Sequence, residues 1–480
     1  MNRLVNQLLH RKAFLISLVI LLFFIFIASA ANYLTPYKDP YTITSEQHLA
    51  APYSIPIWAR IFPQYSKYPP NTNMDLKSPL ILGNGSESFN GTAYTVELKP
   101  SEYENLSFPL SWNYQYPYSF SISFIAIPHG QAAQINVLLK QQNKTYFLES
   151  FVPSADQILY TYPTCPLSMG KTNSITISSE SLSSSNSPYV STLPGNERYI
   201  ASAILPQLIF KPGKYSVIIS IENIGTSPLK VYIYQPKFSA VGRAYGILGT
   251  DNNGASVFAE FVLGARFDLE IAAIATLIIV GIGLIFGLVA GYVGGKVDLF
   301  LNALTDFFLT IPGLPLLITL ETIFVVSGLI LKIGIVPLLI AIIGGLSWMG
   351  TMKIIRSVTL SVRSRTFVEA SKALGSGPFR IIRKHVLPNI LGVVFAQIAY
   401  DVPVVILTES GLDFLGLGIT KFPTWGNMLG YASAYTSPAN GFVWWWVLPP
   451  GFAIIFLSVA LYFIGSTLQD VLSPYKVRGE

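Results

Sequence analysis

The sequence predicts an α-helical membrane protein that carries a large, mainly β domain. Of its 480 residues, 51% are hydrophobic and 12% are charged, and the mean hydropathy is +0.49, whereas about a quarter of the residues in soluble proteins are charged. Residues 32–262 depart from this composition, because they are rich in Ser, Thr, Tyr, Asn and Pro and contain no apolar run long enough to span a bilayer. A soluble domain is therefore inserted into a membrane protein.

A first membrane span is predicted from about Phe14 to Ala31. Its roughly 18 apolar residues meet the length that a helix needs to cross the hydrocarbon. Ala28-Ser29-Ala30 resembles a signal-peptide cleavage site, but the apolar run exceeds the roughly 7 to 15 residues of a signal h-region, so a retained helix is favoured. Five further apolar runs are predicted to span the membrane, at about 269–293, 303–331, 335–352, 390–408 and 446–466.

Six spans return the C-terminus to the side of the N-terminus. With both ends in the cytoplasm, 14 Lys and Arg residues lie inside and three lie outside. The positive-inside rule therefore predicts a multi-pass protein of the plasma membrane, with residues 1–13 and the tail 476–480 cytoplasmic and residues 32–262 extracellular. Residues 32–262 hold 14 Lys/Arg and 14 Asp/Glu, so the net charge of +6 arises in the membrane part and does not indicate nucleic-acid binding.

The inserted domain, assigned to residues 32–243, is predicted to be a β-sandwich. Apolar and polar residues alternate in residues 119–124, 215–221 and 231–234, as in half-buried strands. Residues 223–228 have the turn composition of a hairpin between the last two of these strands. Several short strands with Pro and Gly between them are typical of a sandwich.

Cysteine and sequon content add two expectations for this domain. The single cysteine, Cys165, excludes an intrachain disulfide, and no Cys/His cluster predicts a metal site. Four Asn-x-Ser/Thr sequons, which suit glycosylation at an outer surface but also arise by chance in so Asn- and Ser-rich a sequence, lie at Asn84, Asn90, Asn105 and Asn143.

The basic stretch between the fourth and fifth spans, residues 353–389, is predicted to form a cytoplasmic loop with two short helices. Gly375 or Gly377 can supply the left-handed residue that ends the first helix, Pro378 can open the second, and Pro388 marks the next boundary. Such a helix pair offers a compact surface for a partner protein.

This loop resembles the EAA loop of permeases in ATP-binding-cassette (ABC) importers, through Glu369-Ala370, Gly375 six residues later, and Leu387-Pro388 at its end. The alternative, an ordinary positive-inside loop, does not account for that spacing. The resemblance implies a type I permease with six transmembrane helices, whose coupling helix docks into a cytoplasmic ATPase. The implied coupling residues are Glu369, Ala370, Ser371, Lys372, Ala373, Gly375, Leu387 and Pro388.

The resemblance extends through most of residues 244–475 and narrows to the dipeptide/oligopeptide permeases. The segments that carry it are 248–254, 264–266, 415–418, 423–429, 448–451 and 468–474. Two departures lie on the outer side: Ala255 and Ser256 stand where members commonly have an Arg-Asp pair, and the domain after the first span is far longer than usual.

The family implies a permease subunit of an ATP-driven, binding-protein-dependent importer that works by alternating access and is not itself an enzyme. Its implied partners are a second permease, two ATPase subunits or domains that bind ATP and Mg, an extracellular substrate-binding protein and membrane lipid. Dipeptides or oligopeptides are the expected cargo. The alternatives are an oligosaccharide importer of the same family and, in another class, a membrane-anchored surface adhesion or receptor protein.

Nucleotide binding by this chain itself is not expected. Gly294-Gly295-Lys296 is the nearest approach to a phosphate loop, but Ala290 replaces the required first Gly and Val297 replaces the Ser/Thr that holds magnesium. ATP hydrolysis is therefore expected in a separate partner chain.

Small and charged residues within the spans give the remaining candidate sites. Gly283, Gly287 and Gly291 recur every four residues and predict close helix packing, within this subunit in preference to a partner. Charged groups in spans are costly and tend to face cavities or partners, so the candidates for the substrate pathway are Asp306, Glu321, Asp401 and Glu409. For Asp401, the most deeply placed, lining the pathway and pairing with another helix are equally expected.

Overall fold

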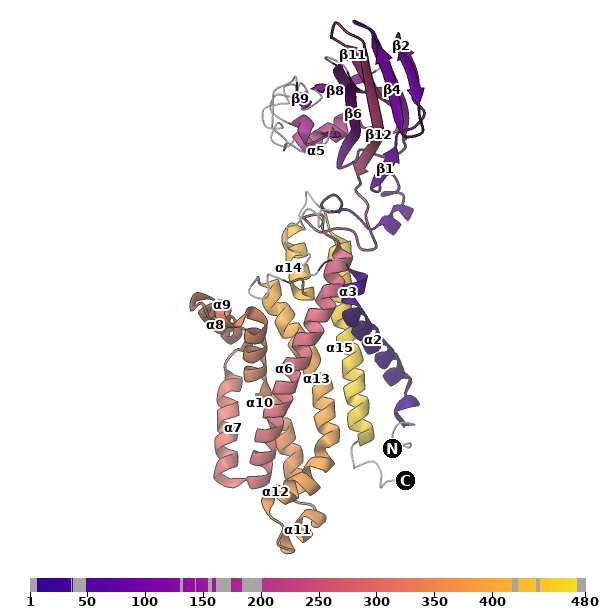
Figure 1. Ribbon diagram of the computed structural model, residues 1–480. Helices are drawn as coiled ribbons and strands as arrows, with labels where there is room; N and C mark the ends of the chain where they lie inside the picture. Colours follow the sequence, from indigo (N-terminus) through magenta and orange to yellow (C-terminus); the bar gives the residue numbers. More distant parts are fainter. Residues whose placement is uncertain are drawn as a thin grey trace. The chain divides into compact units, whose positions relative to one another are not determined.

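The computed structural model describes residues 7–35, 37, 49–129, 133–142, 144–153, 158–160, 174–183, 201–416, 422–436 and 441–472. The chain divides into two compact units (Figure 1). Residues 1–47 and 255–480 form a helical unit, and residues 48–254 form a unit built of β-strands. Two sequence-based candidates, Cys165 and the sequon residue Asn143, lie outside the described residues.

The helices of the first unit are α2 (Lys12–Ser29), α3 (Ala31–Leu34), α6 (Val257–Val293), α7 (Gly295–Thr310), α8 (Gly313–Val326), α9 (Leu329–Ile333), α10 (Ile335–Arg363), α11 (Thr366–Ala373), α12 (Pro378–Ile381), α13 (Leu387–Phe414), α14 (Trp425–Tyr435) and α15 (Trp444–Leu472). A π-helical turn, Ile382–Val386, joins α12 to α13. In the described part of the chain, five helical stretches are long and apolar enough to cross a membrane: α2, α6, α10, Pro378–Phe414 and α15.

The prediction of one continuous span over residues 303–331 is wrong. The structure has α7 and α8 in its place, bent by 83° at the break between them. The cause is Pro312, which lacks an N–H and disfavours the helical region for the residue before it. Ile311 accordingly has extended backbone angles (φ −79°, ψ 127°) and α7 ends before it. Together α7 and α8 can supply a sixth span only as a bent pair.

Other helices are longer than their apolar runs. Helix α6 begins at Val257, ahead of the predicted start at 269, because the Ser256 side chain caps it by accepting a hydrogen bond from the Ala259 N–H. Helix α10 continues past residue 352 to Arg363, so the first part of the predicted loop 353–389 is helical. The helices α6 and α7 are joined at Gly294 and Gly295, both with positive φ (71° and 59°), a conformation that glycine adopts without strain.

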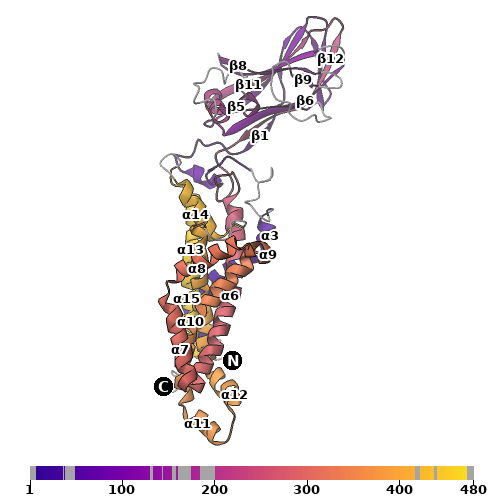
Figure 2. The same cartoon turned by 90° about the vertical axis from the view of Figure 1, so that its left-hand side faces the viewer.

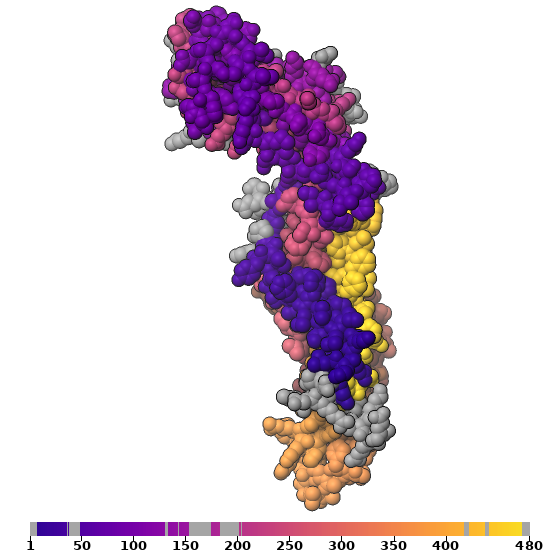
Figure 3. Space-filling view, turned by 90° about the vertical axis from the view of Figure 1, so that its right-hand side faces the viewer, coloured from indigo at the N-terminus to yellow at the C-terminus, as the bar shows by residue number. Residues whose placement is uncertain are grey.

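Helices far apart in sequence lie side by side in this unit. Helix α2 packs along α15, as Figure 3 shows in indigo and yellow, and Arg11 before α2 forms an ion pair of 2.9 Å with Asp470 near the end of α15. Gly392 of α13 lies against Leu472, the last residue of α15. The start of α2, the start of α13 and the end of α15 are therefore at the same end of the bundle, where Figures 1 and 2 also show α11 and α12.

The second unit contains two antiparallel sheets. Its described strands are β1 (Thr72–Asp75), β2 (Leu80–Gly83), β3 (Ser86–Phe89), β4 (Ala93–Leu98), β5 (Tyr103–Trp112), β6 (Ser119–His129), β7 (Ala133–Gln141), β8 (Lys144–Pro153), β9 (Ile158–Tyr160), β10 (Ser174–Ser178), β11 (Gly213–Asn223) and β12 (Leu229–Val241). Its described residues also form the α-helix α5 (Ala201–Ile209). One sheet has the order β10-β6-β12-β4-β3, with β1 also paired to β12, and the other has the order β2-β5-β11-β7-β8-β9.

Both sheets contribute to one buried apolar cluster. Alternate residues of β6, β11 and β12 are buried, which confirms the three strands predicted from alternation. Phe108 and Trp112 from one sheet belong to the same cluster as Phe124 and Phe238 from the other. Each such side chain contributes about 1.5–3 kcal/mol by leaving water, so this core stabilises the unit without a disulfide among its described residues.

The hairpin predicted at residues 223–228 is wrong. Strand β11 pairs with β5 and β7, whereas β12 pairs with β1, β4 and β6, so the loop crosses from one sheet to the other. Asn223 holds this crossing: its Nδ2 donates to the Ser227 carbonyl (2.9 Å) and its Oδ1 accepts from the Gly225 N–H (2.9 Å). Turn residues mark a reversal of the chain but do not specify whether the next strand pairs with the previous one.

Candidate functional site

The first candidate surface is formed by α11 and α12, and its turn is built by glycine and proline. Helix α11 ends in a Schellman motif, in which the Ser376 N–H donates to the Ser371 carbonyl (3.1 Å) and the Gly375 N–H donates to the Lys372 carbonyl (3.0 Å). Gly375 has φ +80°, whereas Gly377 has φ −69° and precedes Pro378, the first residue of α12. Gly375, and not Gly377, is thus the left-handed residue of the loop.

Only one face of α11 is packed against the bundle. Val368 and Ser371 are buried, and Val368 joins an apolar cluster with Ile381 and Val386. On the exposed side lie Glu369, Ala370, Lys372, Ala373 and Gly375. Glu369 lies in the first turn of the helix and Lys372 in the last, which is the favourable placement of each charge relative to the helix dipole.

Three large apolar side chains are exposed on this segment and were not singled out from the sequence. Leu374 is 87% exposed, Phe379 is 77% exposed and Phe367 is 42% exposed. Exposed apolar groups among charged ones are typical of a protein-binding surface. Whether these three side chains face the bundle or water depends on the turn at Gly375. The periodicity of the sequence therefore could not show that they are exposed. We call the exposed side of residues 366–381 the coupling surface.

The two remaining residues proposed for coupling lie at the start of α13. Leu387 is half-buried and packs against the apolar cluster of Val368, whereas Pro388 is exposed in the first turn of α13. They position the end of the loop and are not part of the coupling surface.

The predicted glycine stripe lies against α10 of the same chain. A Cβ built on Gly283 would lie 3.0 Å from Thr351, one on Gly287 would lie 2.9 Å from the Met352 carbonyl oxygen, and one on Gly291 would lie 2.8 Å from the Arg356 carbonyl oxygen. The backbones of α6 and α10 therefore approach so closely that a side chain at Gly287 or Gly291 would force neighbouring atoms to shift, and one at Gly283 would be tightly packed. Since α10 leads directly into α11, this contact ties the coupling surface to the bundle.

Basic residues of α10 also bind α7. Arg356 forms two hydrogen bonds with the carboxylate of Asp298, one of them 2.6 Å long, and Lys353 forms an ion pair with Asp306. Two of the basic residues counted for topology thus hold helices together as well. Asp306, one of the four predicted pathway carboxylates, has a structural partner here.

The other three predicted carboxylates lie in different surroundings. Asp401 is half-buried in α13 and its Oδ2 accepts a hydrogen bond of 2.8 Å from the Thr351 hydroxyl of α10. Glu409 is 1% exposed and accepts a long hydrogen bond (3.4 Å) from Ser410. Glu321 in α8 is 2% exposed, and neither of its oxygens has a hydrogen-bond partner among the described residues. The structure does not gather these four groups into one site.

A buried acidic cluster that sequence reasoning missed lies near Glu409. Asp268 of α6 accepts a hydrogen bond from the Trp425 N–H (3.1 Å), and Asp413 of α13 accepts one from the Thr424 hydroxyl. Glu260 of α6 accepts one from the indole N–H of Trp446 (2.9 Å). These bonds fasten α14 and α15 to α6 and α13.

A signal for this cluster was present in the sequence. Thr424 and Trp425 belong to the segment 423–429 that carries the family resemblance. The partner of Trp425, Asp268, lies 157 positions away, and Glu260 lies 186 positions from its partner Trp446. Only the fold brings them together. No group of three or more Asp, Glu, His or Cys in the described part of the chain has a geometry that could hold a metal ion.

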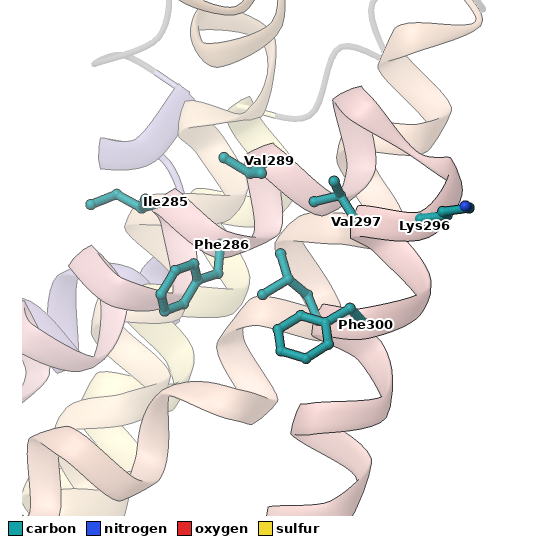
Figure 4. A pocket seen from close by; sticks show the side chains of 7 residues that line it. Ile285, Phe286, Val289, Lys296, Val297 and Phe300 are labelled. Carbon is teal, nitrogen blue, oxygen red and sulfur yellow. The ribbon is translucent and has the colours of Figure 1, made fainter.

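An apolar groove of about 470 Å³ lies between α6 and α7 (Figure 4). It is lined by Ile285, Phe286, Val289, Lys296, Val297, Phe300 and Leu301. Lys296 is its one charged lining residue, so the groove suits hydrocarbon and not a polar solute. The Gly294-Gly295-Lys296 stretch forms the turn between the two helices and the start of α7.

Comparison with known proteins identifies the membrane part of the chain. Residues 283–477 match the family model "Binding-protein-dependent transport system inner membrane component", and residues 2–52 match "N-terminal TM domain of oligopeptide transport permease C". The oligopeptide transport system permease protein OppC of Haemophilus influenzae is 34% identical over 233 residues, which cover 48% of this chain and 70% of that protein. The dipeptide transport system permease protein DppC of Bacillus subtilis is 37% identical over 227 residues, 47% of this chain and 68% of that protein.

Among solved structures, the inward-facing MetNI methionine ABC transporter matches 45% of this chain and 97% of its own chain, with 18% identity and a TM-score of 0.38. The sequence matches define the class of the protein, a permease subunit of a membrane transport system. More specifically, the chain belongs to the family of binding-protein-dependent ABC importer permeases that includes the dipeptide and oligopeptide permeases, which confirms the resemblance seen in the sequence.

Proposed function

We propose that this chain is one of the two permease subunits of an ATP-driven importer for dipeptides or oligopeptides, located in the plasma membrane. The single observation that carries the cargo class is the identity of 34–37% to permeases named for oligopeptide and dipeptide transport over more than two thirds of their length. Neither the sugar-transport alternative nor the surface-adhesion alternative has comparable support.

We further propose six spans, with the bent pair α7–α8 as the third, and a β-sandwich for residues 48–254. The apolar composition of α7–α8 supports the first assignment. The shared core of the two sheets supports the second. Both chain ends and the coupling surface would then be cytoplasmic and the β unit extracellular. The Arg11–Asp470 ion pair and the basic residues of 353–384 at one end of the bundle are consistent with that orientation.

The coupling surface is proposed to dock into a cleft of a cytoplasmic ATPase subunit. Leu374 and Phe379 would leave water on docking and supply most of the binding energy, while Glu369 and Lys372 at their side would fix the orientation. ATP and Mg would be bound by the two ATPase subunits. The two ATPases would approach each other only with nucleotide bound. In that arrangement they would bind one conformation of the permease pair more tightly than the other, and so shift the pair between its inward-open and outward-open states.

Movement of the coupling surface would be transmitted by α10. The close glycine contact with α6 and the ion pairs with α7 make α6, α7 and α10 move together. A second permease subunit would complete the pathway, and a substrate-binding protein would deliver the peptide from outside. Of the four pathway candidates, Asp401 is best placed to act, because its Oδ2 is held by Thr351 while the side chain remains partly exposed; Glu321 and Glu409 are enclosed within the subunit.

Uptake by proteoliposomes that contain the complete importer tests this function. We expect ATP-dependent uptake of radiolabelled dipeptides or oligopeptides in the presence of the binding protein, and no uptake of oligosaccharides. Uptake of sugars alone would overturn the cargo class and leave the transport role intact. Purification in mild detergent without any ATPase subunit would contradict the transport role itself.

A further inference from the structure

The strands β2 and β3 form an exposed apolar edge of the β unit. Each is an end strand, since β2 pairs only with β5 and β3 only with β4 among the described strands. Leu80, Leu82 and Phe89 are 68%, 66% and 57% exposed, and Figure 1 shows β2 at the margin of the sheets. Unpaired backbone groups beside apolar side chains make such an edge prone to self-association. We call the exposed side chains of Leu80, Leu82 and Phe89, with the strands β2 and β3 that carry them, the apolar edge.

Two of the four sequons lie within or next to this apolar edge. Asn84 and Gly85 connect β2 to β3, which begins at Ser86, and Asn90-Gly91-Thr92 follows β3 directly. Both asparagines are exposed. A glycan on either residue would start at one end of β3 and extend over the apolar edge.

The amide of Asn90 is oriented for modification. Its Oδ1 accepts hydrogen bonds from the Thr92 hydroxyl (2.9 Å), the Thr92 N–H (3.1 Å) and the Ala93 N–H (2.8 Å). Its Nδ2 has no hydrogen-bond partner among the described residues and is left to react. The three donors hold the carbonyl oxygen in place, so the amide keeps one orientation in which Nδ2 is accessible on this exposed residue.

Asn105 has the same motif in unsuitable surroundings. It lies within β5, paired with Leu82 on one side and with Ser220 on the other, and its side chain is half-buried. An extended backbone that is hydrogen-bonded in the middle of a sheet cannot bend into a transferase active site without breaking the sheet. The structure therefore separates sequons that the sequence alone could not rank.

We propose that Asn84 and Asn90 are N-glycosylated outside the cell, that Asn105 is not, and that the glycans cover the apolar edge. This inference rests on the proposed orientation of the β unit. The co-reactant is an oligosaccharide linked through phosphate to a lipid carrier. A bond forms between Nδ2 and the anomeric carbon, the bond from that carbon to the phosphate oxygen breaks, the lipid phosphate leaves, and the amide nitrogen loses one proton.

The test uses the full-length chain purified from membranes of the organism that encodes it. Cleavage after glutamate separates the three sites, since Glu87, Glu97 and Glu104 lie between them, and cleavage after Lys140 removes Asn143. Mass spectrometry is expected to find hexose-containing mass increments on the Asn84 and Asn90 peptides and none on the Asn105 peptide. Unmodified Asn84 and Asn90, or a modified Asn105, would overturn the proposal.

Variants that remove only the hydroxyl group of each sequon test whether the glycans cover the apolar edge. Ser86→Ala with Thr92→Ala is expected to abolish the mass increments and to increase the oligomeric fraction in size-exclusion chromatography with light scattering. Ser107→Ala, which removes the Asn105 sequon, is the matched control and is expected to change neither. Loss of the glycans without any increase in self-association would overturn the covering role.

The orientation is tested separately, so that the two proposals can fail independently. Ile224, 48% exposed in the loop between β11 and β12, is replaced by Cys in a Cys165→Ser background. If a membrane-impermeant maleimide labels this cysteine in intact cells while Asn84 and Asn90 are unmodified, glycosylation is refuted and the extracellular location stands. Labelling only after cell lysis would refute the extracellular location.

Discussion

Leu374 is the residue through which the proposed docking can be tested most directly. At 87% exposure its side chain contributes little to the fold of this subunit, so a substitution there acts mainly on a partner. We expect Leu374→Asp to weaken binding of the ATPase subunit by about 2 kcal/mol, roughly 30-fold. Titration of the purified permease complex with ATPase subunit, followed by light scattering, measures this change.

The matched control for Leu374 is Ile224→Asp, because Ile224 is also an exposed aliphatic residue but lies in the β unit. It is expected to leave ATPase binding unchanged. Equal binding by the Leu374→Asp variant and the unmodified chain would remove the coupling surface from the proposed mechanism.

Glu149 in β8 predicts a pH dependence of the β unit. Burial raises the pKa of its carboxyl to about 7 from the usual 4.5. The folded unit therefore retains a proton that the unfolded chain releases above pH 4.5, so stability falls as the pH rises through the interval from about 4.5 to 7. Glu149→Gln removes this loss and is expected to stabilise the unit at pH 8 but not at pH 4.

Hydrogen–deuterium exchange of the β7 and β8 amides in the full-length protein measures the effect of Glu149→Gln. Glu222→Gln is the control, since Glu222 is an exposed carboxylate in the same sheet. Slower exchange of the Glu149→Gln variant at pH 4 as well as at pH 8 would indicate a cause other than the carboxyl's protonation.

At the scale of the helices, α6 and α10 approach along a stripe of glycines. A methyl group on Gly287 would lie 2.9 Å from Met352 and Ile355 atoms, whereas nothing lies within 4 Å of a methyl group on Gly281 of the same helix. We expect Gly287→Ala to destabilise the helical unit by about 1–3 kcal/mol through overpacking. Gly281→Ala is expected to be neutral or slightly stabilising, because alanine favours the helix.

The two glycine variants are compared by heating each in detergent and measuring how much monodisperse protein remains at each temperature. We expect the temperature at which half of the protein is lost to be lower for Gly287→Ala than for Gly281→Ala. Equal midpoints would show that the helices can separate without cost and that the contact does not hold α10.

The turn of the coupling loop also depends on one glycine. Gly375 has φ +80° and closes α11, whereas Gly377 has φ −69°, which any residue adopts. Gly375→Ala is expected to cost about 1–2 kcal/mol locally and to lower peptide-stimulated ATP hydrolysis, while Gly377→Ala retains it. Full stimulation in the Gly375→Ala variant would contradict a need for this turn geometry.

Sequence patterns predicted well those features that depend on residues close together in the sequence. Alternation of apolar and polar residues identified segments of β6, β11 and β12, and glycine and proline located the break between α11 and α12. Apolar length alone merged α7 and α8, although Pro312 marked their boundary. Pairing partners were not predictable, because residues 223–228 reverse the chain equally well within one sheet or between two.

The candidate sites show the same limit. Glu369 and Gly375 were identified by their spacing, but the exposure of Leu374 and Phe379 beside them depends on how α11 packs against Ile381 and Val386. The four carboxylates chosen because they fall in or next to predicted spans lie in different surroundings, and Glu321 has no hydrogen-bond partner among the described residues. Asp268 was missed because its partner, Trp425, lies 157 positions away and only the folded chain brings the two residues together.

At the scale of the whole molecule, the β unit is joined to the helical unit as an insertion whose two ends lie together. The Leu49 N–H donates to the Gly254 carbonyl at 3.2 Å, so the chain enters and leaves the β unit at adjacent points. Insertions with close ends can be removed with little effect on the host fold. A variant in which a short Gly/Ser linker replaces residues 50–253 is therefore expected to insert in the membrane, to remain monodisperse and to bind the ATPase subunit with unchanged affinity.

The same variant separates the functions of the two units. If the β unit guides the substrate-binding protein, the variant is expected to bind that protein at least tenfold more weakly and to lose uptake in proportion, while basal ATP hydrolysis is unchanged. Because removal of the β unit leaves α10, α11 and the acidic cluster in place, a loss of ATPase binding would instead show that the helical unit cannot fold alone. Unchanged uptake and unchanged affinity for the binding protein would exclude a docking role and leave transport to the helices.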